Sequence, residues 1–465
     1  MPGRRVEGSP VAPLAAFSAA TNLGIAGRVF RLDPGLRDPD AVRALLAGFG
    51  GREVDDADAV LLGGRVDVDA SAGARIARAR GGMTATAAAA GALGDLVDGL
   101  RIGISMVLEP KTAVLALLLA EAGAEVAVFA FAAETDDAVA AALADRGVAV
   151  HASASAAPEE ERRHALALLD RRPQLLLDDG AHVIRLAHAQ RPDVVAGLIG
   201  AAEETTSGVR PLRAMAADGA LAVPVVAAND AVTKTWFDNR HGTGETCVLA
   251  IVRALDDDLS ASRAVVVGFG PVGEGVAARL RVLGAAVTVV DLDPRRELAA
   301  RFAGFRTTPV LEAVTDADLV VSATGVARTI DPAVLAACRE DAVVAVAGGA
   351  PEEVLPSTAT RREPVAPHVE RLHLPAGGSV RLLAGGDCVN IVAGEGNPID
   401  VMDLSFAVQV AAIRHLVTQR GALGPGVHAL PEAADRGAAA LALGREAGTG
   451  PSAPPVDWSR TRFDL

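Results

Sequence analysis

The sequence predicts an α/β protein made of two doubly wound parallel-sheet domains. From about residue 100, short apolar runs alternate with helical stretches, which is the pattern of βα units in a parallel sheet covered on both faces. A second series of such units begins near residue 262 with a continuous apolar strand. Because ligands bind at the carboxyl ends of the strands in such sheets, polar residues that directly follow a strand are the first candidates for a site.

The first series begins with a buried strand over 101–108 and a helix from Pro110, a favoured first helical position. Further strands are expected over 125–131, 148–151, 174–177 and 223–228, and a helix over 136–146. Two of these strands run directly into polar pairs, Asp178-Asp179 and Asn229-Asp230. Residues 1–99 are harder to interpret, since 70–90 are rich in alanine and glycine without a clear period.

The second series carries a complete dinucleotide-binding fingerprint. A strand over 264–267 leads into a glycine-rich turn that opens a helix, and the next strand, 286–290, ends on an acid. The glycines let the backbone turn tightly beside a pyrophosphate, and the acid accepts hydrogen bonds from the adenosine ribose. We therefore predict that NAD binds here, the acid favouring NAD over NADP; the alternative is a Rossmann unit that has lost its cofactor. The predicted binding residues are Gly268, Gly270, Pro271, Val272, Gly273 and Asp291.

Lysine is almost absent from the chain: the 44 basic residues include only Lys111 and Lys234. Arginine stays protonated in proteins, whereas a partly buried lysine can exchange a proton if its pKa is lowered toward neutrality. Lys234 lies in the polar run 229–239. We expect it to be a functional amine of this kind; the alternative is an ordinary surface lysine.

Composition argues against several classes of protein. A net charge of −14 disfavours nonspecific binding to nucleic acid. We find no long uncharged apolar run, so no membrane span is expected, and no signal-peptide segment follows Arg4 and Arg5. The three cysteines and nine histidines are scattered without ligand spacing, so we expect no metal site and a cytoplasmic location.

Taken in chain order, these polar clusters and the glycine fingerprint resemble the S-adenosylhomocysteine hydrolase family. The resemblance covers roughly residues 100–445 and leaves the first hundred residues and the tail uncovered. The matching segments are Glu204-Thr205-Thr206-Ser207-Gly208-Val209, Asn229-Asp230, Val232-Thr233-Lys234, Phe237-Asp238-Asn239, Gly268-Phe269-Gly270, Val272-Gly273, Thr324-Gly325, Leu382-Leu383-Ala384, Val389-Asn390, Ser405-Phe406 and Gly426-Val427-His428.

The resemblance implies an NAD-binding Rossmann domain inserted in a split substrate domain. It also implies a homo-oligomer, dimer or tetramer, that binds a small nucleoside-like substrate in a cleft closed by two hinges. The expected boundaries are 1–99 for a divergent N-terminal region of the substrate domain, 100–240 for the substrate domain, 246–398 for the NAD domain, 399–446 for the return to the substrate domain, and 447–465 for the tail.

The family's chemistry is a transient oxidation. Bound NAD oxidises the ribose 3′-hydroxyl, a carboxylate then removes the acidified C4′ proton, and the 5′ substituent leaves before water adds. Carried over by position, Lys234 and Asp238 would act at the 3′-hydroxyl, Glu204 and Thr205 would hold the 2′-hydroxyl, and Asp179 would be the base at C4′. The resemblance places Asn229, Asn239, Asn390, Thr205, Thr206, Thr324 and Gly325 near the cofactor. The alternatives are that Asp179 only caps a helix and that Glu204 is a capping-box acid.

The other half of the site departs from the family. Val107, Gly349 and Asn397 stand where the family has histidines, and Lys111 stands where an acid reads adenine. Each lost buried hydrogen-bond partner costs about 1–3 kcal/mol, so the pocket must be rebuilt. We expect Glu109 to replace a histidine as general acid. Lys111, Glu395 and Asn397 are expected to contact substrate, with Lys111 paired to Glu395 or to a substrate group; the alternative is an exposed lysine at a helix start.

The sequence therefore predicts a divergent enzyme that oxidises C3′ of a nucleoside-type substrate, removes the C4′ proton, and eliminates or adds water or a thiol at C5′. We expect a role in nucleoside natural-product metabolism. One alternative is a genuine S-adenosylhomocysteine hydrolase that yields adenosine and homocysteine. The other is an inactive, NAD-binding regulatory paralogue.

Overall fold

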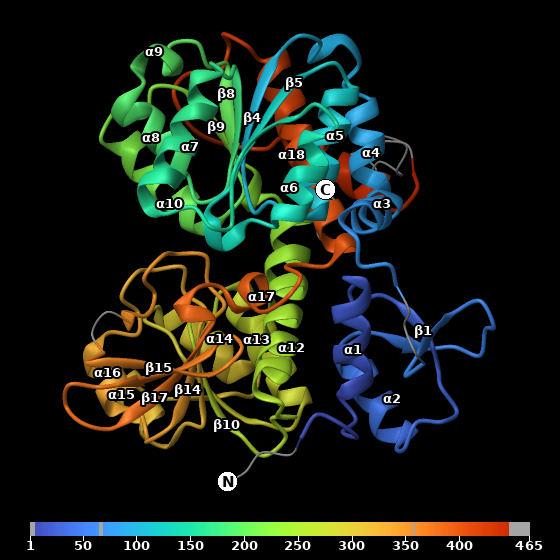
Figure 1. Cartoon of the computed structure of the whole chain (residues 1–465), viewed down its shortest axis with the longest axis vertical. Coiled ribbons are helices and arrows are strands. Elements are labelled where there is room, and N and C mark those ends of the chain that lie inside the picture. The colour runs from blue at the N-terminus through green and yellow to red at the C-terminus, as the bar shows by residue number, and fades with distance from the viewer. Residues whose placement is uncertain (1–4, 65–67, 357–358, 446–465) are drawn as a thin grey trace, which may run out of the picture.

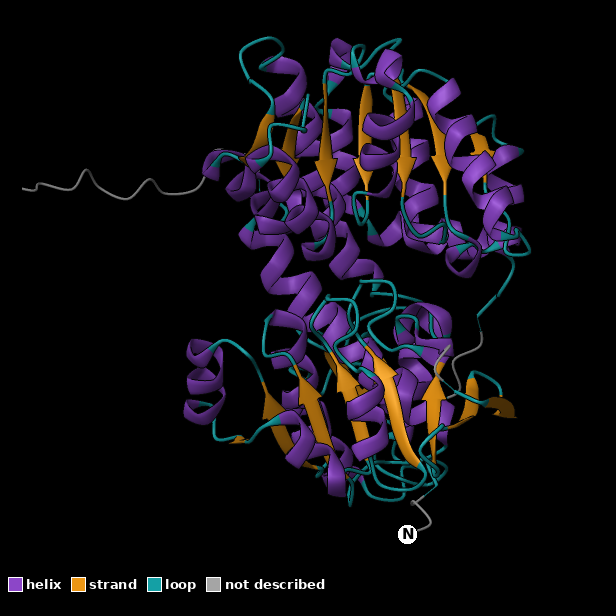
Figure 2. Cartoon of the chain, turned by 90° about the vertical axis from the view of Figure 1, so that its left-hand side faces the viewer, coloured by secondary structure: helices purple, strands orange, loops and turns teal. Residues whose placement is uncertain are grey.

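The computed structural model describes residues 5–64, 68–356 and 359–445. Two lobes lie one above the other, each built around a sheet (Figures 1 and 2). A π-helix over Thr235–Thr243 and then α12 (Gly244–Leu255) lead the chain from the upper lobe into the lower one. The tail expected over 447–465 falls outside the described residues.

The upper lobe holds a seven-stranded sheet in the order β18-β9-β8-β7-β4-β5-β6, in which every neighbouring pair is parallel. Its strands are β4 (Arg101–Ser105), β5 (Glu125–Phe129), β6 (Ala149–His151), β7 (Leu175–Asp178), β8 (Gly200–Glu203), β9 (Pro224–Ala227) and β18 (Gly426–Ala429). The sequence did not indicate β8, because glycine and alanine have low strand propensity, yet β8 is buried along its length.

Helices cover both faces of this sheet. They are α3 (Ala72–Gly82), α4 (Thr84–Gly91), α5 (Pro110–Glu121), α6 (Asp137–Ala144), α7 (Pro158–Asp170), α8 (His182–Gln190), α9 (Pro192–Val195), α10 (Thr206–Ala217), α18 (Ile399–Thr418) and α19 (Glu432–Ala442). Helix α5 begins at Pro110 as predicted, because the Glu109 side chain caps it by accepting the Lys111 N–H. The chain thus leaves this lobe after Lys234 and returns to it with α18.

Helix α18 has the length and hydropathy of a membrane-crossing helix. Its residues Phe406, Val410 and Ile413 are instead part of the upper lobe's core, beside residues of β4, β7 and β9. Its apolar composition is therefore explained by burial in the core of this lobe.

The lower lobe holds an eight-stranded sheet in the order β12-β11-β10-β13-β14-β17-β16-β15. Its strands are β10 (Arg263–Val267), β11 (Ala286–Val290), β12 (Arg306–Thr307), β13 (Leu319–Ser322), β14 (Ala342–Val346), β15 (Arg361–Ala366), β16 (Val369–His373) and β17 (Ser379–Leu383). Strands β10 to β14 are parallel as expected. Strand β16 is antiparallel to both its neighbours, because only two residues separate it from β15 and so short a connection makes a hairpin.

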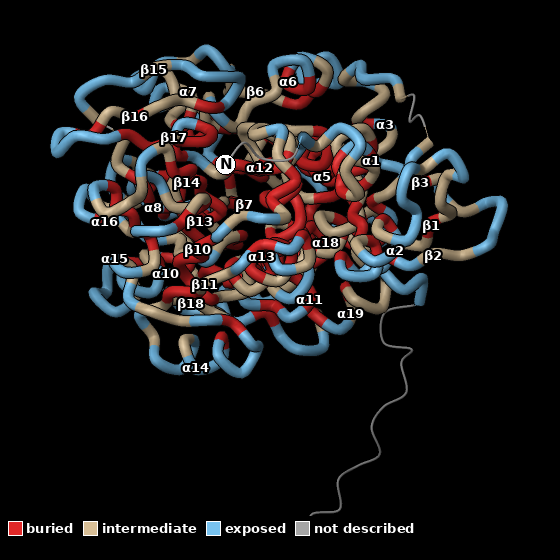
Figure 3. The backbone as a smooth tube through the Cα atoms, turned by 90° about the horizontal axis from the view of Figure 1, so that it is seen from below, coloured by how far each residue is buried: buried red, intermediate tan, exposed pale blue. Residues whose placement is uncertain are grey.

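The helices of the lower lobe include α13 (Pro271–Val282), α14 (Pro294–Phe302), α15 (Val310–Ala313), α16 (Pro332–Ala337) and α17 (Val389–Val392). Seen from below, strands β10, β13 and β14 are buried while exposed loops form the rim (Figure 3). The carboxyl ends of these strands point toward the upper lobe's polar turns, since residues that follow strands of both sheets line one cavity.

The assignment of residues 1–99 to the substrate domain was wrong for their first part. Residues 5–64 contain α1 (Ala12–Thr21), α2 (Pro39–Gly48) and a small parallel sheet of β1 (Val29–Leu32), β2 (Arg52–Glu53) and β3 (Val60–Leu62). This N-terminal module lies beside α12 in Figure 1. Phe17 and Phe30 belong to the same core cluster as residues of α12 and α13, so apolar burial ties the module to the lower lobe. Helices α3 and α4, with Leu93 and Val97 after them, pack in the upper lobe.

Replacing Phe30 by alanine tests this attachment. Phe30 is fully buried and makes an edge contact with Phe17, with 5.0 Å between ring centroids. We expect Phe30→Ala to lower the free energy of unfolding by about 3–5 kcal/mol, measured by urea unfolding with circular dichroism. The matched control is Phe302→Ala, because Phe302 is 87% exposed and its loss should change stability by less than about 0.5 kcal/mol. Equal effects of the two changes would contradict the packing described.

Candidate active site

A cavity of about 450 Å³ lies where the carboxyl ends of the two sheets meet. Residues that follow β4, β7 and β8 line it from above, and residues that follow β10, β13 and β14 line it from below. Among its lining residues are the predicted positions Glu109, Lys111, Asp179, Glu204, Thr205, Thr206, Lys234, Asp238, Asn239, Gly270, Pro271, Val272, Thr324, Gly325, Asn390 and Asn397. Tertiary folding therefore brings into one space groups that are nearly 300 residues apart in the chain.

Lys234 is the centre of the upper wall. Its Nζ lies 2.6 Å from Asp238 Oδ2 and 2.9 Å from Asn239 Oδ1, and 3.7 Å from Glu204 Oε1. The nine-residue π-helix that follows Lys234 explains this geometry, because one of its wider turns brings residues four and five positions along beneath the same side chain. Such helices are rare and are frequently found at functional sites.

The expectation that Lys234 exchanges a proton near neutral pH was wrong for the cavity as it stands. Burial by itself would lower the pKa of this ammonium group. The negative charges of Asp238 and Glu204 outweigh that effect and raise the pKa of Lys234 above its ordinary value. Lys234 is therefore a buried, permanently protonated cation.

Glu204 is held by the segment that returns to the upper lobe. It lies just after β8, and its carboxylate accepts hydrogen bonds from Ser405 Oγ and Gln409 Nε2 on α18. Burial raises the pKa of Glu204 to about 7 although the Lys234 charge acts in the opposite direction. Glu204 thus has hydrogen-bond partners from α18 rather than the role of a helix-capping acid.

Asp179 stands on a turn fixed by two other carboxylates. Asp178 accepts the N–H of Ile184 at 2.7 Å, and Glu203 accepts the N–H groups of Gly180 and Ala181 at 2.9 Å each. The Asp179 side chain is left to face the cavity. Burial raises its pKa to about 6 against the opposing charge of Lys234. A carboxylate with this pKa is ionised at neutral pH and is a stronger base than an ordinary aspartate.

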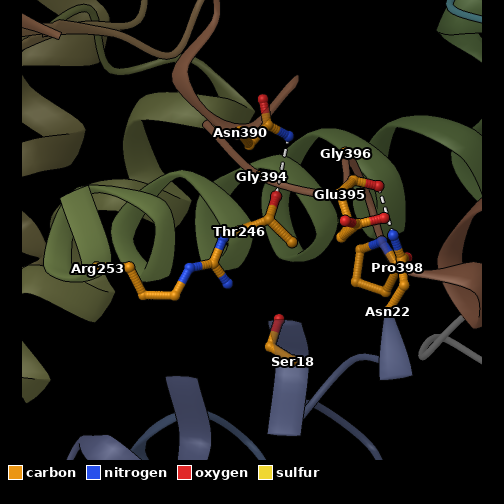
Figure 4. A pocket seen from close by; sticks show the side chains of 9 residues that line it. All are labelled: Ser18, Asn22, Thr246, Arg253, Asn390, Gly394, Glu395, Gly396 and Pro398. Carbon is orange, nitrogen blue, oxygen red and sulfur yellow. Dashed lines mark hydrogen bonds between the residues drawn. The ribbon is translucent and has the colours of Figure 1, made fainter. Parts of the chain in front are cut away.

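An asparagine network links the two lobes across the cavity. Asn397 donates to Asp238 and, at 3.0 Å, to Thr243 Oγ1. Asn390 donates to Asn397 Oδ1 at 2.8 Å and to Thr246 Oγ1 at 2.9 Å, the second of which is drawn in Figure 4. Asn239 in turn donates to Asn229 at 3.3 Å. Asn397, which stands where the related family has a histidine, is therefore a positioning partner of Asp238.

The glycine turn after β10 forms a cradle that fits a dinucleotide. Gly268 has a φ of +99°, and a Cβ on Gly273 would lie 1.9 Å from the Gly268 carbonyl oxygen. Gly270, Pro271 and Val272 open α13 toward the cavity. Backbone N–H groups at a helix N-terminus and the space left by missing Cβ atoms are what a pyrophosphate requires.

Two carboxylates hold the turns around this cradle. Asp291, at the end of β11, accepts the N–H of Phe269 at 2.6 Å and the N–H of Asp293 at 2.8 Å, which places it beside the glycine turn. Buried Glu353 accepts the N–H of Gly325 at 3.0 Å and fixes the Thr324-Gly325 turn. Glu353 could not be predicted from the sequence, because its role depends on folding next to β13.

The predicted set Glu109, Lys111 and Glu395 is arranged differently from expectation. Lys111 is 2% exposed, and its Nζ lies 2.8 Å from Glu109 Oε2 and 3.0 Å from the Glu395 carbonyl oxygen. The Glu395 carboxylate instead pairs with Arg75 at 2.9 Å and does not line the cavity. Figure 4 shows Glu395 beside Asn22, whose amide also donates to its carbonyl. Lys111 is thus a buried lysine that joins Glu109 to the Glu395 backbone, not an exposed one. Glu395 is not a cavity residue.

Several cavity residues were not predicted from the sequence, among them Glu134, His182 and Arg296. Burial raises the pKa of Glu134 to about 8, with the charge of Asp179 adding to the effect. His182 begins α8 with its ring 5.1 Å from that of Phe131, and burial lowers its pKa. Arg296 lies beside Gly270 at the dinucleotide turn. The nearness of His182 to Asp178-Asp179 in the sequence was the one usable signal.

Comparison with known families gives two matches that agree with this division of the chain. The family model of S-adenosyl-L-homocysteine hydrolase matches residues 79–192. The model of that enzyme's NAD-binding domain matches residues 239–396.

Curated relatives cover about three quarters of the chain. An adenosylhomocysteinase from Thermotoga maritima is 37% identical over 75% of this chain and 87% of its own length. An S-inosyl-L-homocysteine hydrolase from Methanothermobacter thermautotrophicus is 39% identical over 72% of this chain and 82% of its own. A protein of the same name from Methanopyrus kandleri is 38% identical, with coverages of 75% and 83%.

Substituting Gly273 tests the dinucleotide cradle. A Cβ there would overlap the Gly268 carbonyl and force the turn open. We expect Gly273→Ala to weaken NAD binding at least about tenfold, measured by isothermal titration calorimetry, a change of about 1.4 kcal/mol. Gly73→Ala is the matched control, since a Cβ at Gly73 meets nothing within 4 Å. Unchanged NAD affinity in Gly273→Ala would contradict this placement of the pyrophosphate.

Proposed function

This chain belongs to the S-adenosyl-L-homocysteine hydrolase family of NAD-dependent enzymes, and we propose that it cleaves the 5′ thioether of a nucleoside after transient oxidation at C3′. The observation that carries the proposal is the buried cluster of Lys234, Asp238 and Glu204 in the same cavity as the dinucleotide cradle. A cation flanked by two carboxylates is suited to bind and deprotonate a ribose diol next to a nicotinamide.

The 3′ step rests on the Lys234–Asp238 pair. Bound NAD would supply the oxidation of the C3′ hydroxyl to a ketone. Lys234, held protonated, would orient the 3′-oxygen, and the carboxylate of Asp238 beside it would accept the hydroxyl proton. Glu204 accepts a hydrogen bond from the neighbouring 2′-hydroxyl, and Ser405 and Gln409 fix its orientation.

The next step belongs to Asp179. A ketone at C3′ acidifies the C4′ proton, and a base on the facing wall can then remove it. Asp179 shares the cavity with Lys234 and has a pKa of about 6, so it is ionised at neutral pH. Loss of the C4′ proton permits elimination of the C5′ substituent, and water then adds to the same carbon.

The names of the relatives support homocysteine as the 5′ group. One is named for adenosylhomocysteine and two for S-inosyl-homocysteine, so the base differs among proteins of similar identity to this chain. We propose a nucleosidyl homocysteine with adenine or hypoxanthine as substrate. A homo-oligomer in the cytoplasm is part of the same proposal.

A second candidate is elimination from a different nucleoside, in a natural-product pathway. It is favoured by the cavity positions Val107 and Gly349, where the related family has histidines that serve the leaving group and the 3′-oxygen. Lys111 stands at the position of the acid that reads adenine in the related family. Its ammonium group already pairs with Glu109 and with the Glu395 carbonyl oxygen. An inactive regulatory paralogue is disfavoured, because the buried cluster around Lys234 lines the same cavity as the dinucleotide cradle.

The direct test measures homocysteine release from S-adenosylhomocysteine and from S-inosylhomocysteine by the NAD-loaded protein. We expect release from at least one of them and a loss of at least about 100-fold in Lys234→Ala. Gly73→Ala serves as the control, since a Cβ at Gly73 meets nothing within 4 Å and Gly73 does not line the cavity. If neither thioether releases homocysteine while NAD is bound and reduced by another nucleoside, the second candidate replaces the first.

A further inference from the structure

We propose that Glu134 is the general acid that donates a proton to the departing 5′ group. The inference rests on the proposed function and assigns a role that neither the sequence comparison nor the family resemblance gives to this residue. It replaces the expectation that Glu109 has this task.

The sheet order places Glu134 on the same edge of the sheet as the base, two strands away. Strand β4 lies between β7 and β5, Asp179 follows β7, and Glu134 lies on the turn that follows β5. Both side chains line the cavity from the same edge of the sheet. Because C5′ is bonded to C4′, an acid that serves the C5′ substituent must stand next to the base that serves C4′.

The backbone brings Glu134 to the position where a histidine is missing. The Glu134 carbonyl oxygen accepts the N–H of Leu108 at 2.9 Å. Leu108 directly follows Val107, which stands where the related family has its leaving-group histidine. The turn after β5 therefore brings a carboxyl group to the stretch of wall from which the imidazole has been lost.

The charges around Glu134 give it the protonation state that an acid needs. Burial, then the charges of Asp179, Asp387 and Glu161, raise its pKa to about 8. These carboxylates face it from the turn after β7, from the lower lobe and from α7. The Asp179 carboxyl, with a pKa of about 6, is ionised while Glu134 is still protonated. Two neighbouring carboxyl groups with separated pKa values can divide the roles of base and acid.

The other groups in this part of the cavity are less suitable. Glu109 caps α5 and forms an ion pair with Lys111 at 2.8 Å. Its carboxylate is therefore engaged in holding the start of this helix. Burial and then Arg185 lower the pKa of His182, which makes it a neutral ring at pH 7. Only Glu134 among these three combines a neutral acid with a place beside Asp179.

Asp179 takes the C4′ proton, the electron pair of that bond forms the C4′–C5′ double bond, and the C5′–S bond breaks. The sulfur leaves with the electron pair of that bond and takes the proton of Glu134, which becomes a carboxylate. When water adds to C5′, Glu134 recovers a proton from it and Asp179 returns one to C4′.

Glu134→Gln isolates this proton. Glutamine keeps the size and the neutral charge of the protonated acid, so a structural role would survive and only the transferable proton is lost. With S-adenosylhomocysteine and S-inosylhomocysteine as probes, we expect homocysteine release to fall at least about 100-fold. NAD reduction, followed at about 340 nm, and exchange of the C4′ proton with D2O should both remain.

Four outcomes would overturn the assignment. Normal turnover by Glu134→Gln, or loss of C4′ exchange together with turnover, would remove Glu134 as the acid. If Glu109→Gln stops homocysteine release but keeps C4′ proton exchange, and Glu134→Gln does not, Glu109 is the acid. If the unaltered enzyme shows neither NAD reduction nor C4′ exchange with either probe, the proposed function fails and this assignment fails with it.

The pH profile provides a second readout. We expect kcat/KM to rise as Asp179 ionises near pH 6 and to fall as Glu134 loses its proton near pH 8. Glu161→Gln keeps the hydrogen bond to the Ala132 N–H but removes a negative charge near Glu134. It should retain turnover and move the descending limb to lower pH; an unmoved limb would show that a different group sets it.

Discussion

The structure depends on the burial of one ammonium group. Lys234 is 2% exposed, and a buried charge without partners would cost several kcal/mol. Its partners come from three passages of the chain: Glu204 after β8, Asp238 in the π-helix, and α18, which orients Glu204 through Ser405 and Gln409. The Lys234 charge has all these partners only when the first half of the upper lobe and its returning segment are folded together. The ion cluster therefore forms only in the assembled split domain.

Burial then separates the roles of the carboxyl groups. Glu203 and Asp178 accept hydrogen bonds from backbone N–H groups and fix the turns, whereas Asp179, Glu204 and Glu134 face the cavity. The Lys234 charge opposes the effect of burial on Asp179 and Glu204 but is not among the causes that act on Glu134. The residues that we propose as base and hydroxyl acceptor thus feel the Lys234 charge, and the residue that we propose as acid does not.

The two lobes are joined by few covalent links but share one polar wall. Asn397 and Asn390 connect Asp238 to the start of α12, while Lys111 ties α5 to the segment that leads into α18. The N-terminal module is anchored to the lower lobe by Phe17 and Phe30, yet Asn22 at the end of α1 contacts the same Glu395 carbonyl as Lys111. Any closing motion of the lobes would therefore change the hydrogen bonds that this carbonyl accepts.

The sequence by itself determined the parallel βα units, the dinucleotide turn from Gly268 to Gly273, and the polar residues that follow β7 and β9, because these are local patterns of period and spacing. It also singled out Lys234 through the scarcity of lysine. Only the tertiary structure decided that Lys234 stays protonated, that Glu395 turns away from the cavity and that residues 5–64 join the lower lobe. It alone brought Glu134 into the same cavity as Asp179. These outcomes depend on burial and on charges contributed by segments far apart in the chain, and such sums have no local signature in a sequence.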